Sequence, residues 1–285
     1  MDSGRHVLFL FSAILLSQLN PAQLLVAVAL AASVAVASWY ARFLSVSGSI
    51  ATFVLASLIF GLGGVQWSVP ILTFFITSSV LSRVGKKKKA SYQLIFEKTD
   101  TRDTGQVAAN GGVAGILLIC SFLFPLKADW YLLYLASLSS VTADTWGTEL
   151  GLLSGSLPRS ITTLRRTETG TSGAVSISGL VGGAAGALTI AMSGCFWQNR
   201  SDLPATIATI VIAGVIGSLV DSLLGATAQA RLRCDVCGKM TERVIHCATP
   251  TRLVGGVRWI RNDIVNWVCA TAGPASVLLF MLLKR

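Results

Sequence analysis

Charged residues are scarce in this sequence. Asp, Glu, Lys and Arg make up only 13% of the 285 residues, whereas soluble domains contain about 25%. Hydrophobic residues make up 53%, and the mean hydropathy is +0.68. The shortage of charge excludes an ordinary soluble domain, and the lack of alternating strands of about ten residues excludes a transmembrane β-barrel.

Long apolar runs separate the few clusters of charge. They are roughly 18–22 residues long, enough for a helix to cross a bilayer core of about 30 Å. We therefore predict an all-α, polytopic integral membrane helical bundle of about nine transmembrane helices, forming a single transmembrane domain over residues 1–285. In a bacterium it would lie in the cytoplasmic membrane. The expected spans are 7–20, 23–41, 48–65, 67–83, 106–125, 130–151, 174–194, 205–228 and 263–283. No A-x-A cleavage site closely follows the first, so it is predicted to be an anchor.

Lysine and arginine are concentrated in three connections, 84–105, 152–173 and 229–262. Positively charged loops stay in the cytoplasm, so all three are predicted there, with a cytoplasmic N-terminus and the C-terminus outside. Insertion topology and contact with anionic headgroups of the lipid bilayer account for the net charge of +10 without a nucleic-acid partner. An anionic substrate would be a third explanation for the net positive charge.

Three carboxylates interrupt the predicted spans. Asp144 and Glu149 lie in "TADTWGTELG", and Asp221 lies in "LVDSLLGATAQ". Ionisable groups inside a membrane are costly and mark functional sites, so all three are predicted catalytic residues. Asp144 and Asp221 each lie about 10 Å from the cytoplasmic end of their helix, which predicts one shared layer. Glu149 is about 140° from Asp144 on an ideal helix. It would join the site only if the helix breaks near Gly147; otherwise it would hold a basic loop residue.

Amide side chains approach the same depth from two other helices. Gln106 and Asn110 are one helical turn apart, as are Asn262 and Asn266. Carboxylate and amide oxygens suit Mg²⁺, so we predict this ion as cofactor, bound by the two aspartates. Asn110 and Asn266 would position phosphate or metal. The alternative is that these groups only hydrogen-bond helix to helix.

Two further acidic residues are predicted to cap helices. "DTGQ" fits a capping box, with Asp103 as N-cap and Gln106 three residues later. Asp263 lies at a helix start, where the dipole stabilises a carboxylate.

The connection "PRSITTLRRTETGTSGAVSISG" combines arginine, hydroxyl and glycine residues before a helix. Arginine forks bind phosphate oxygens, and a helix N-terminus binds anions. The predicted substrate-binding residues here are Arg159, Arg165, Arg166, Thr167, Gly170 and Thr171. The alternative is an ordinary positively charged loop. "KKKK" at 86–89 lacks such neighbours and is assigned to topology or lipid contact.

Four metal-binding residue types lie in "CDVCGKMTERVIHC": Cys234, Cys237, His246 and Cys247. The C-x-x-C-G knuckle with a later His and Cys is typical of half a zinc ribbon, and structural Zn²⁺ takes four such ligands. Adjacent His and Cys are awkward at one tetrahedral centre. Structural zinc, uncoordinated thiols and metal shared with a second chain remain open, while a disulfide is not expected in the cytoplasm.

Five segments together resemble one membrane family: "QVAANGG", "TADTWGTELG", "PRSITTLRRTETGTSGAVSISG", "LVDSLLGATAQ" and "RNDIVNW". It includes animal transmembrane protein 19 and the phytyl-phosphate kinases of plants and cyanobacteria. The resemblance implies phosphorylation of an isoprenyl monophosphate to the diphosphate, and the related phytol and dolichol kinases use CTP. A looser similarity reaches phosphatidate cytidylyltransferases with a K-T-x-E-G segment. "RTETG" departs from it because Arg166 replaces Lys and Glu168 comes one place early, so Glu168 is left out of the site.

The predicted function is therefore a membrane-embedded isoprenyl-phosphate kinase. It would transfer a phosphoryl group from a nucleotide triphosphate, CTP or ATP, to phytyl or a similar prenyl monophosphate. The alternatives are a lipid or small-molecule transporter or flippase, a CDP-lipid-forming cytidylyltransferase and a non-enzymatic scaffold. Polar groups near one membrane face favour chemistry there over passage across the bilayer. No feature of the sequence specifies an oligomeric state.

Overall fold

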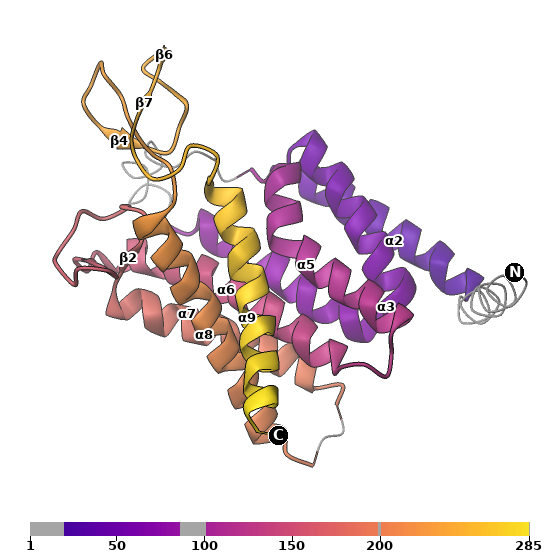
Figure 1. Cartoon of the computed structure of the whole chain (residues 1–285). Helices are drawn as coiled ribbons and strands as arrows, with labels where there is room; N and C mark the ends of the chain where they lie inside the picture. The colour runs from indigo at the N-terminus through magenta and orange to yellow at the C-terminus, as the bar shows by residue number, and fades with distance from the viewer. Residues whose placement is uncertain (1–19, 86–100, 199–200, 285) are drawn as a thin grey trace, which may run out of the picture.

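The computed structural model describes residues 20–85, 101–198 and 201–284, which form a bundle of seven helices (Figure 1). The helices are α2 (Pro21–Tyr40), α3 (Val46–Arg83), α5 (Thr104–Leu123), α6 (Trp130–Ser154), α7 (Ile177–Cys195), α8 (Leu203–Thr227) and α9 (Asn262–Leu283). All except α6 are long and apolar enough to cross a membrane. The predicted helical membrane bundle is thus confirmed. The count of nine spans and the cytoplasmic N-terminus stay predictions, and 7–20 and 86–89 lie outside the described residues.

Helix α3 folds back on itself at Gly64. This residue has φ +65° and ψ −158°, a conformation that glycine adopts without a Cβ clash. Near the end of α3, the Arg83 guanidinium donates to the carbonyl of Ala41 and lies 3.7 Å from the ring centroid of Phe43. Both ends of α3 therefore lie at the same end of the bundle. The reversal falls where the sequence predicts a break, between spans 48–65 and 67–83.

Helix α6 is the centre of the bundle. Thirteen consecutive residues, 131–143, are buried, and α6 contacts α3, α5, α7, α8 and α9. Because neighbouring helices separate α6 from lipid, it tolerates hydroxyl side chains that pair with other helices. The Ser139 hydroxyl, for example, donates to the Ile210 carbonyl of α8 at 3.0 Å. This shielding explains why α6 is less apolar than its neighbours.

Glycines bring the backbones of α6 and α7 into direct contact. A Cβ on Gly183 would lie 2.9 Å from the Ala143 carbonyl oxygen, and one on Gly179 would lie 2.9 Å from the Gly147 carbonyl oxygen. Small residues of this kind allow helix backbones to approach closely.

Hydrogen bonds stabilise both ends of the bundle. At one end, the Tyr131 hydroxyl donates to the carbonyls of Gln66 and Gly194. At the other, the capping box that starts α5 is confirmed. The Asp103 carboxylate accepts from the Gln106 N–H at 3.0 Å, and the Gln106 side chain accepts from the Asp103 N–H at 3.2 Å.

Seven short strands correct the all-α prediction. They occur in two connections, 159–175 and 231–255, at the end of the bundle opposite the C-terminus (Figure 1). β1 (Arg159–Ser160) pairs with β2 (Ala174–Val175). The second connection holds β3 (Arg231–Arg233), β4 (Met240–Thr241), β5 (Ile245–His246), β6 (Thr249–Pro250) and β7 (Arg252–Gly255), with sheet orders β4-β3-β7 and β5-β6. Strands of two to four residues give these connections backbone partners without the apolar periodicity that sequence analysis detects.

Candidate functional site

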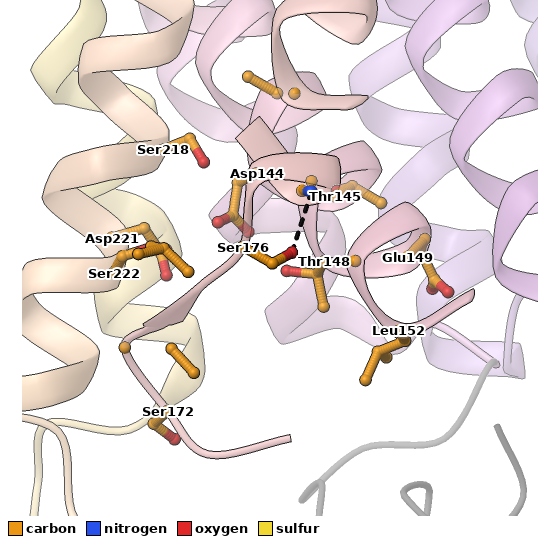
Figure 2. Close-up of a pocket in the computed structure, with 18 of the residues that line it drawn as sticks. Asp144, Thr145, Thr148, Glu149, Leu152, Ser172, Ser176, Ser218, Asp221 and Ser222 are labelled. Carbon is orange, nitrogen blue, oxygen red and sulfur yellow. Dashed lines mark hydrogen bonds between the residues drawn. The ribbon is translucent and has the colours of Figure 1, made fainter. Parts of the chain in front are cut away.

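A polar cavity of about 330 Å³ opens at the end of the bundle that carries the short strands. Its walls come from α6, α7 and α8, from the ends of α5 and α9, and from the segment 169–176. Figure 2 shows this segment crossing in front of the helices that carry Asp144 and Asp221. The cavity thus joins segments that are far apart in the sequence.

The two aspartates predicted as metal ligands lie in this cavity. Asp144 of α6 and Asp221 of α8 both line it (Figure 2). Ser218, one turn before Asp221, is close enough to interact with the Asp144 carboxylate. The Oδ2 atom of Asp221 is buried and has no hydrogen-bond partner among the residues that the structure describes. Burying a carboxylate oxygen without a hydrogen-bond partner costs free energy, unless a bound ligand offsets that cost.

A third carboxylate, Glu242, was not predicted from the sequence. It follows β4 in the connection that carries the cysteines, and it lines the cavity. Its Oε1 accepts from the Ser172 hydroxyl at 2.9 Å and from the Gln229 side chain at 3.0 Å. A glutamate in a basic connection has no periodic signal, so only the tertiary contacts reveal it.

The N-terminus of α7 also faces the cavity. Ser176 is the N-cap, and its hydroxyl accepts from the Gly179 N–H at 3.1 Å (Figure 2). Ser176, Gly179 and Gly183 all line the cavity. Free backbone N–H groups and the helix dipole favour an anion here, beside the carboxylates.

The predicted amide residues reach the cavity as well. Asn110 and Gln106 line it from α5, and the Asn110 Nδ2 atom donates to the Gln106 carbonyl at 2.8 Å. Asn262 and Asn266 line it from the first turns of α9. Asp263, predicted at a helix start, is in the first turn of α9 and is not among the lining residues. These amides add oxygen and N–H groups to the wall of the cavity.

Glu149 lines another part of the same cavity. Helix α6 runs unbroken through Gly147, so the alternative of a break that turns Glu149 toward Asp144 is wrong. Figure 2 shows Glu149 directed away from the two aspartates. Its charge acts instead on Arg102, which also lines the cavity. Burial lowers the pKa of Arg102 to about 10, and the nearby Glu149 carboxylate opposes this shift. The pairing agrees with the other expectation, a carboxylate holding a basic loop residue.

The predicted phosphate-binding residues divide into two groups. Gly170 and Thr171 line the cavity, together with Thr169, Ser172 and Gly173. The other four predicted residues do not line the cavity: Thr167, Arg159, Arg165 and Arg166. Arg159, Arg165 and Arg166 are exposed, and Arg159 donates to the Leu164 carbonyl of its own loop at 2.9 Å. Arg102 is the arginine that reaches the cavity among the residues described, and its isolated position before a helix gave no sequence signal.

Gly173 lets the segment 169–176, which is rich in Ser and Thr, pack directly against α8. Its φ is +75°, and an added Cβ would lie 2.4 Å from the Ala226 backbone nitrogen. We expect Gly173→Ala to displace Thr171 and Ser172 and to destabilise the segment by about 1–2 kcal/mol from backbone strain alone. Limited proteolysis of the purified protein should show faster cleavage within 160–175. Gly155→Ala, at a helix C-cap with φ +69°, is the matched control for backbone strain without that contact. Equal cleavage rates in the two variants would contradict this role.

The four predicted zinc ligands lie outside the cavity lining. Cys234, Cys237, His246 and Cys247 form one cluster, with their ligand atoms within 4.8 Å of one another.

The fold and cavity define an integral membrane protein with a carboxylate-lined cavity at one end of its helical bundle. Residues 29–274 match the model of the family described as integral membrane protein DUF92, and the chain belongs to that family. No solved structure matches it.

Three relatives illustrate the range of the family. Protein PGR of Arabidopsis thaliana is 33% identical over 272 residues, 86% of this chain and 92% of that protein. An uncharacterized membrane protein of Methanocaldococcus jannaschii, MJ0933, is 33% identical over 189 residues, 65% of this chain and 74% of its own length. The chloroplastic protein VTE6 of Arabidopsis thaliana is 24% identical over 243 residues, 83% of this chain and 65% of its own length.

Proposed function

We propose that this protein is a membrane-embedded isoprenyl-phosphate kinase that transfers the γ-phosphoryl group of CTP or ATP to a prenyl monophosphate such as phytyl phosphate. One observation carries the proposal. A single cavity combines Asp144, Asp221 and Glu242 with the N-terminus of α7. Carboxylates suit a divalent cation, and a helix N-terminus suits the phosphates that such a cation accompanies.

The residues of the cavity fit Mg²⁺. The buried, unpartnered Oδ2 of Asp221 lies in the same cavity as the carboxylate of Asp144. The donor set is all oxygen, which Mg²⁺ prefers over nitrogen or sulfur. We assign Asp144 and Asp221 as its ligands. When bound, the ion supplies charge neutralisation on the transferred phosphoryl group.

The chain's own groups position the two phosphates. We assign the backbone N–H groups at the start of α7 and the hydroxyl of Thr171 to phosphate oxygens. We assign the side chains of Asn110 and Asn266 to the other side of the phosphates. The acceptor oxygen is already anionic, so no strong general base is needed. Its bond to the γ-phosphorus forms while the bond from that phosphorus to the bridging oxygen breaks, and the nucleoside diphosphate leaves.

The assignment of a lipid substrate rests on the position of the cavity and on the sequence resemblance to phytyl-phosphate kinases. The cavity lies at one end of an apolar bundle, where a lipid phosphate meets water while its tail remains among helices. Segments such as "TADTWGTELG" and "LVDSLLGATAQ", which resemble those of phytyl-phosphate kinases, supply Asp144 and Asp221. The strands and basic connections at this end support placing nucleotide entry there.

The exposed arginines have a secondary role in this account. Arg165 and Arg166 lie on the loop whose following residues line the cavity, so they attract nucleotide phosphates without touching the reacting atoms. We expect Arg165→Gln together with Arg166→Gln to raise the KM for nucleotide about 3–10-fold at low salt, with kcat unchanged, because steering by exposed charge is screened by salt. Steady-state kinetics at two ionic strengths measures this. A large loss of kcat would place these side chains at the reacting phosphates.

The proposal is tested by product analysis. Purified protein in liposomes is supplied with Mg²⁺, phytyl or geranylgeranyl monophosphate, and either CTP or ATP, and lipids are identified by mass spectrometry. A prenyl diphosphate is the expected product. A CDP-linked lipid would move the assignment to cytidylyl transfer. Absence of any product from folded protein with both nucleotides would overturn the kinase assignment.

A further inference from the structure

The cysteine-containing connection between α8 and α9 holds four metal-ligand atoms in one place. The Sγ atoms of Cys234, Cys237 and Cys247 and a ring nitrogen of His246 all lie within 4.8 Å of one another. The His246 Nδ1 atom is 3.6 Å from the Cys237 Sγ and 3.3 Å from the Cys247 Sγ. Tetrahedral Zn²⁺, with bonds of about 2.3 Å to sulfur and about 2.0 Å to nitrogen, separates these atoms by about 3.5 Å. The observed separations agree with that geometry.

The backbone resolves the difficulty of using adjacent residues as ligands. Cys247 has φ +50° and Ala248 has φ +57°, a left-handed conformation that is unusual for residues other than glycine. This turn reverses the chain between β5 and β6, so that His246 and Cys247 direct their side chains to one point. Strained backbone of this kind persists where surrounding interactions compensate its cost.

The first two cysteines are presented by a tight knuckle. The Gly238 N–H donates to the Cys234 carbonyl at 2.9 Å, and the Cys234 N–H donates to the Lys239 carbonyl at 3.0 Å. Gly238 itself has φ +72°, which its lack of a Cβ permits. The turn keeps the Cys234 and Cys237 side chains on one side of the loop, as zinc knuckles require.

We propose that Cys234, Cys237, His246 and Cys247 bind one structural Zn²⁺, and that the zinc-bound segment holds Glu242 in the wall of the cavity. Glu242 lies between the two ligand pairs in the sequence, and it bridges Ser172 and Gln229. The segment between Cys237 and His246 contains the short strand β4 and the first residue of β5. Binding of zinc by three thiolates and one neutral imidazole, with release of the thiol protons, closes this segment at both ends.

The zinc content of the protein can be measured independently of its enzymatic activity. Full-length protein, purified without metal-affinity steps, should contain one zinc per chain by elemental mass spectrometry. X-ray absorption should give three sulfur neighbours and one nitrogen. Cys234→Ser with Cys237→Ser should lose the metal, whereas Cys120→Ser, a half-buried α5 thiol outside the cluster, should keep it. Zinc absent from the wild type, or retained by the double variant, would overturn the site.

The link to Glu242 has its own test and rests on the proposed kinase function. Glu242→Gln should keep one zinc per chain and lower kcat at least 10-fold. Loss of zinc should lower kcat by a similar factor while exposing 235–246 to protease. Full activity in Glu242→Gln with zinc still bound would overturn the link and leave the metal site standing. Inactivity of the wild type with every substrate would instead defeat the kinase proposal while zinc content is unaffected.

Discussion

Asp221→Asn is expected to lower kcat/KM for phosphoryl transfer by about 10²–10³-fold, the cost of removing one preorganised charge-stabilising group from an active site. The substitution keeps the size of the side chain and removes its negative charge. Because Asp221 Oδ2 is buried and has no hydrogen-bond partner in the described part of the chain, removing the charge should not unfold the bundle. Steady-state kinetics of diphosphate formation, together with thermal stability in detergent, measures both effects.

Asp202→Asn is the matched control on the same helix. Asp202 is the N-cap of α8 at the opposite end, where its carboxylate accepts from the Ala205 N–H at 3.3 Å. Asparagine caps a helix as well as aspartate does, so activity should remain within twofold of the wild type. If Asp221→Asn were as active as Asp202→Asn, the assigned metal ligand would be wrong.

Gly183→Leu is expected to separate α6 from α7, to lower the thermal stability and to abolish activity. A Cβ at this position would lie 2.9 Å from the Ala143 carbonyl oxygen, and a backbone atom cannot move aside as a flexible side chain does. Overpacking of a core costs typically about 1–3 kcal/mol. Here the displaced residue also precedes Asp144, so the carboxylate moves with it. Fluorescence-detected size-exclusion chromatography after heating measures the stability loss.

Ala185→Leu separates this effect from added hydrophobic bulk. Ala185 lies on the same helix and is exposed on its outer side, where a leucine enters lipid or detergent at little cost. We expect thermal stability and activity close to those of the wild type. A Gly183→Leu protein as stable and active as Ala185→Leu would contradict the close backbone contact between α6 and α7.

The bundle was predictable because its helices, except the central α6, are long and apolar enough to be recognised one by one. The reversal in α3 was also predictable, since "FGLGGVQW" supplies glycines where two apolar runs meet. The strands in 159–175 and 231–255 were not, because pairs of two to four residues carry no periodic pattern. Sequence patterns therefore predicted the helical membrane bundle but missed the structure of its connections.

The candidate site was predictable where a residue was out of place in its surroundings. Asp144 and Asp221 are carboxylates in apolar helices, which is a strong signal. Glu242 is an ordinary residue in a polar connection, and its place in the cavity depends on how that connection folds over Ser172. For Arg165 and Arg166 the error was the opposite one: the sequence predicted them in the site, and the structure places them outside the cavity lining. Their composition is typical of phosphate binding, yet loop geometry leaves them exposed.

The most direct test of the central claim follows the phosphoryl group itself. Wild-type protein in liposomes receives a prenyl monophosphate and CTP or ATP carrying ¹⁸O in the γ-phosphoryl group, and the lipid product is weighed by mass spectrometry. The account predicts a prenyl diphosphate that contains all the label from one γ-phosphoryl group, formed about 10²–10³-fold more slowly by Asp221→Asn. A labelled lipid from Asp221→Asn at the wild-type rate, or an unlabelled CDP-lipid from the wild type, would contradict it.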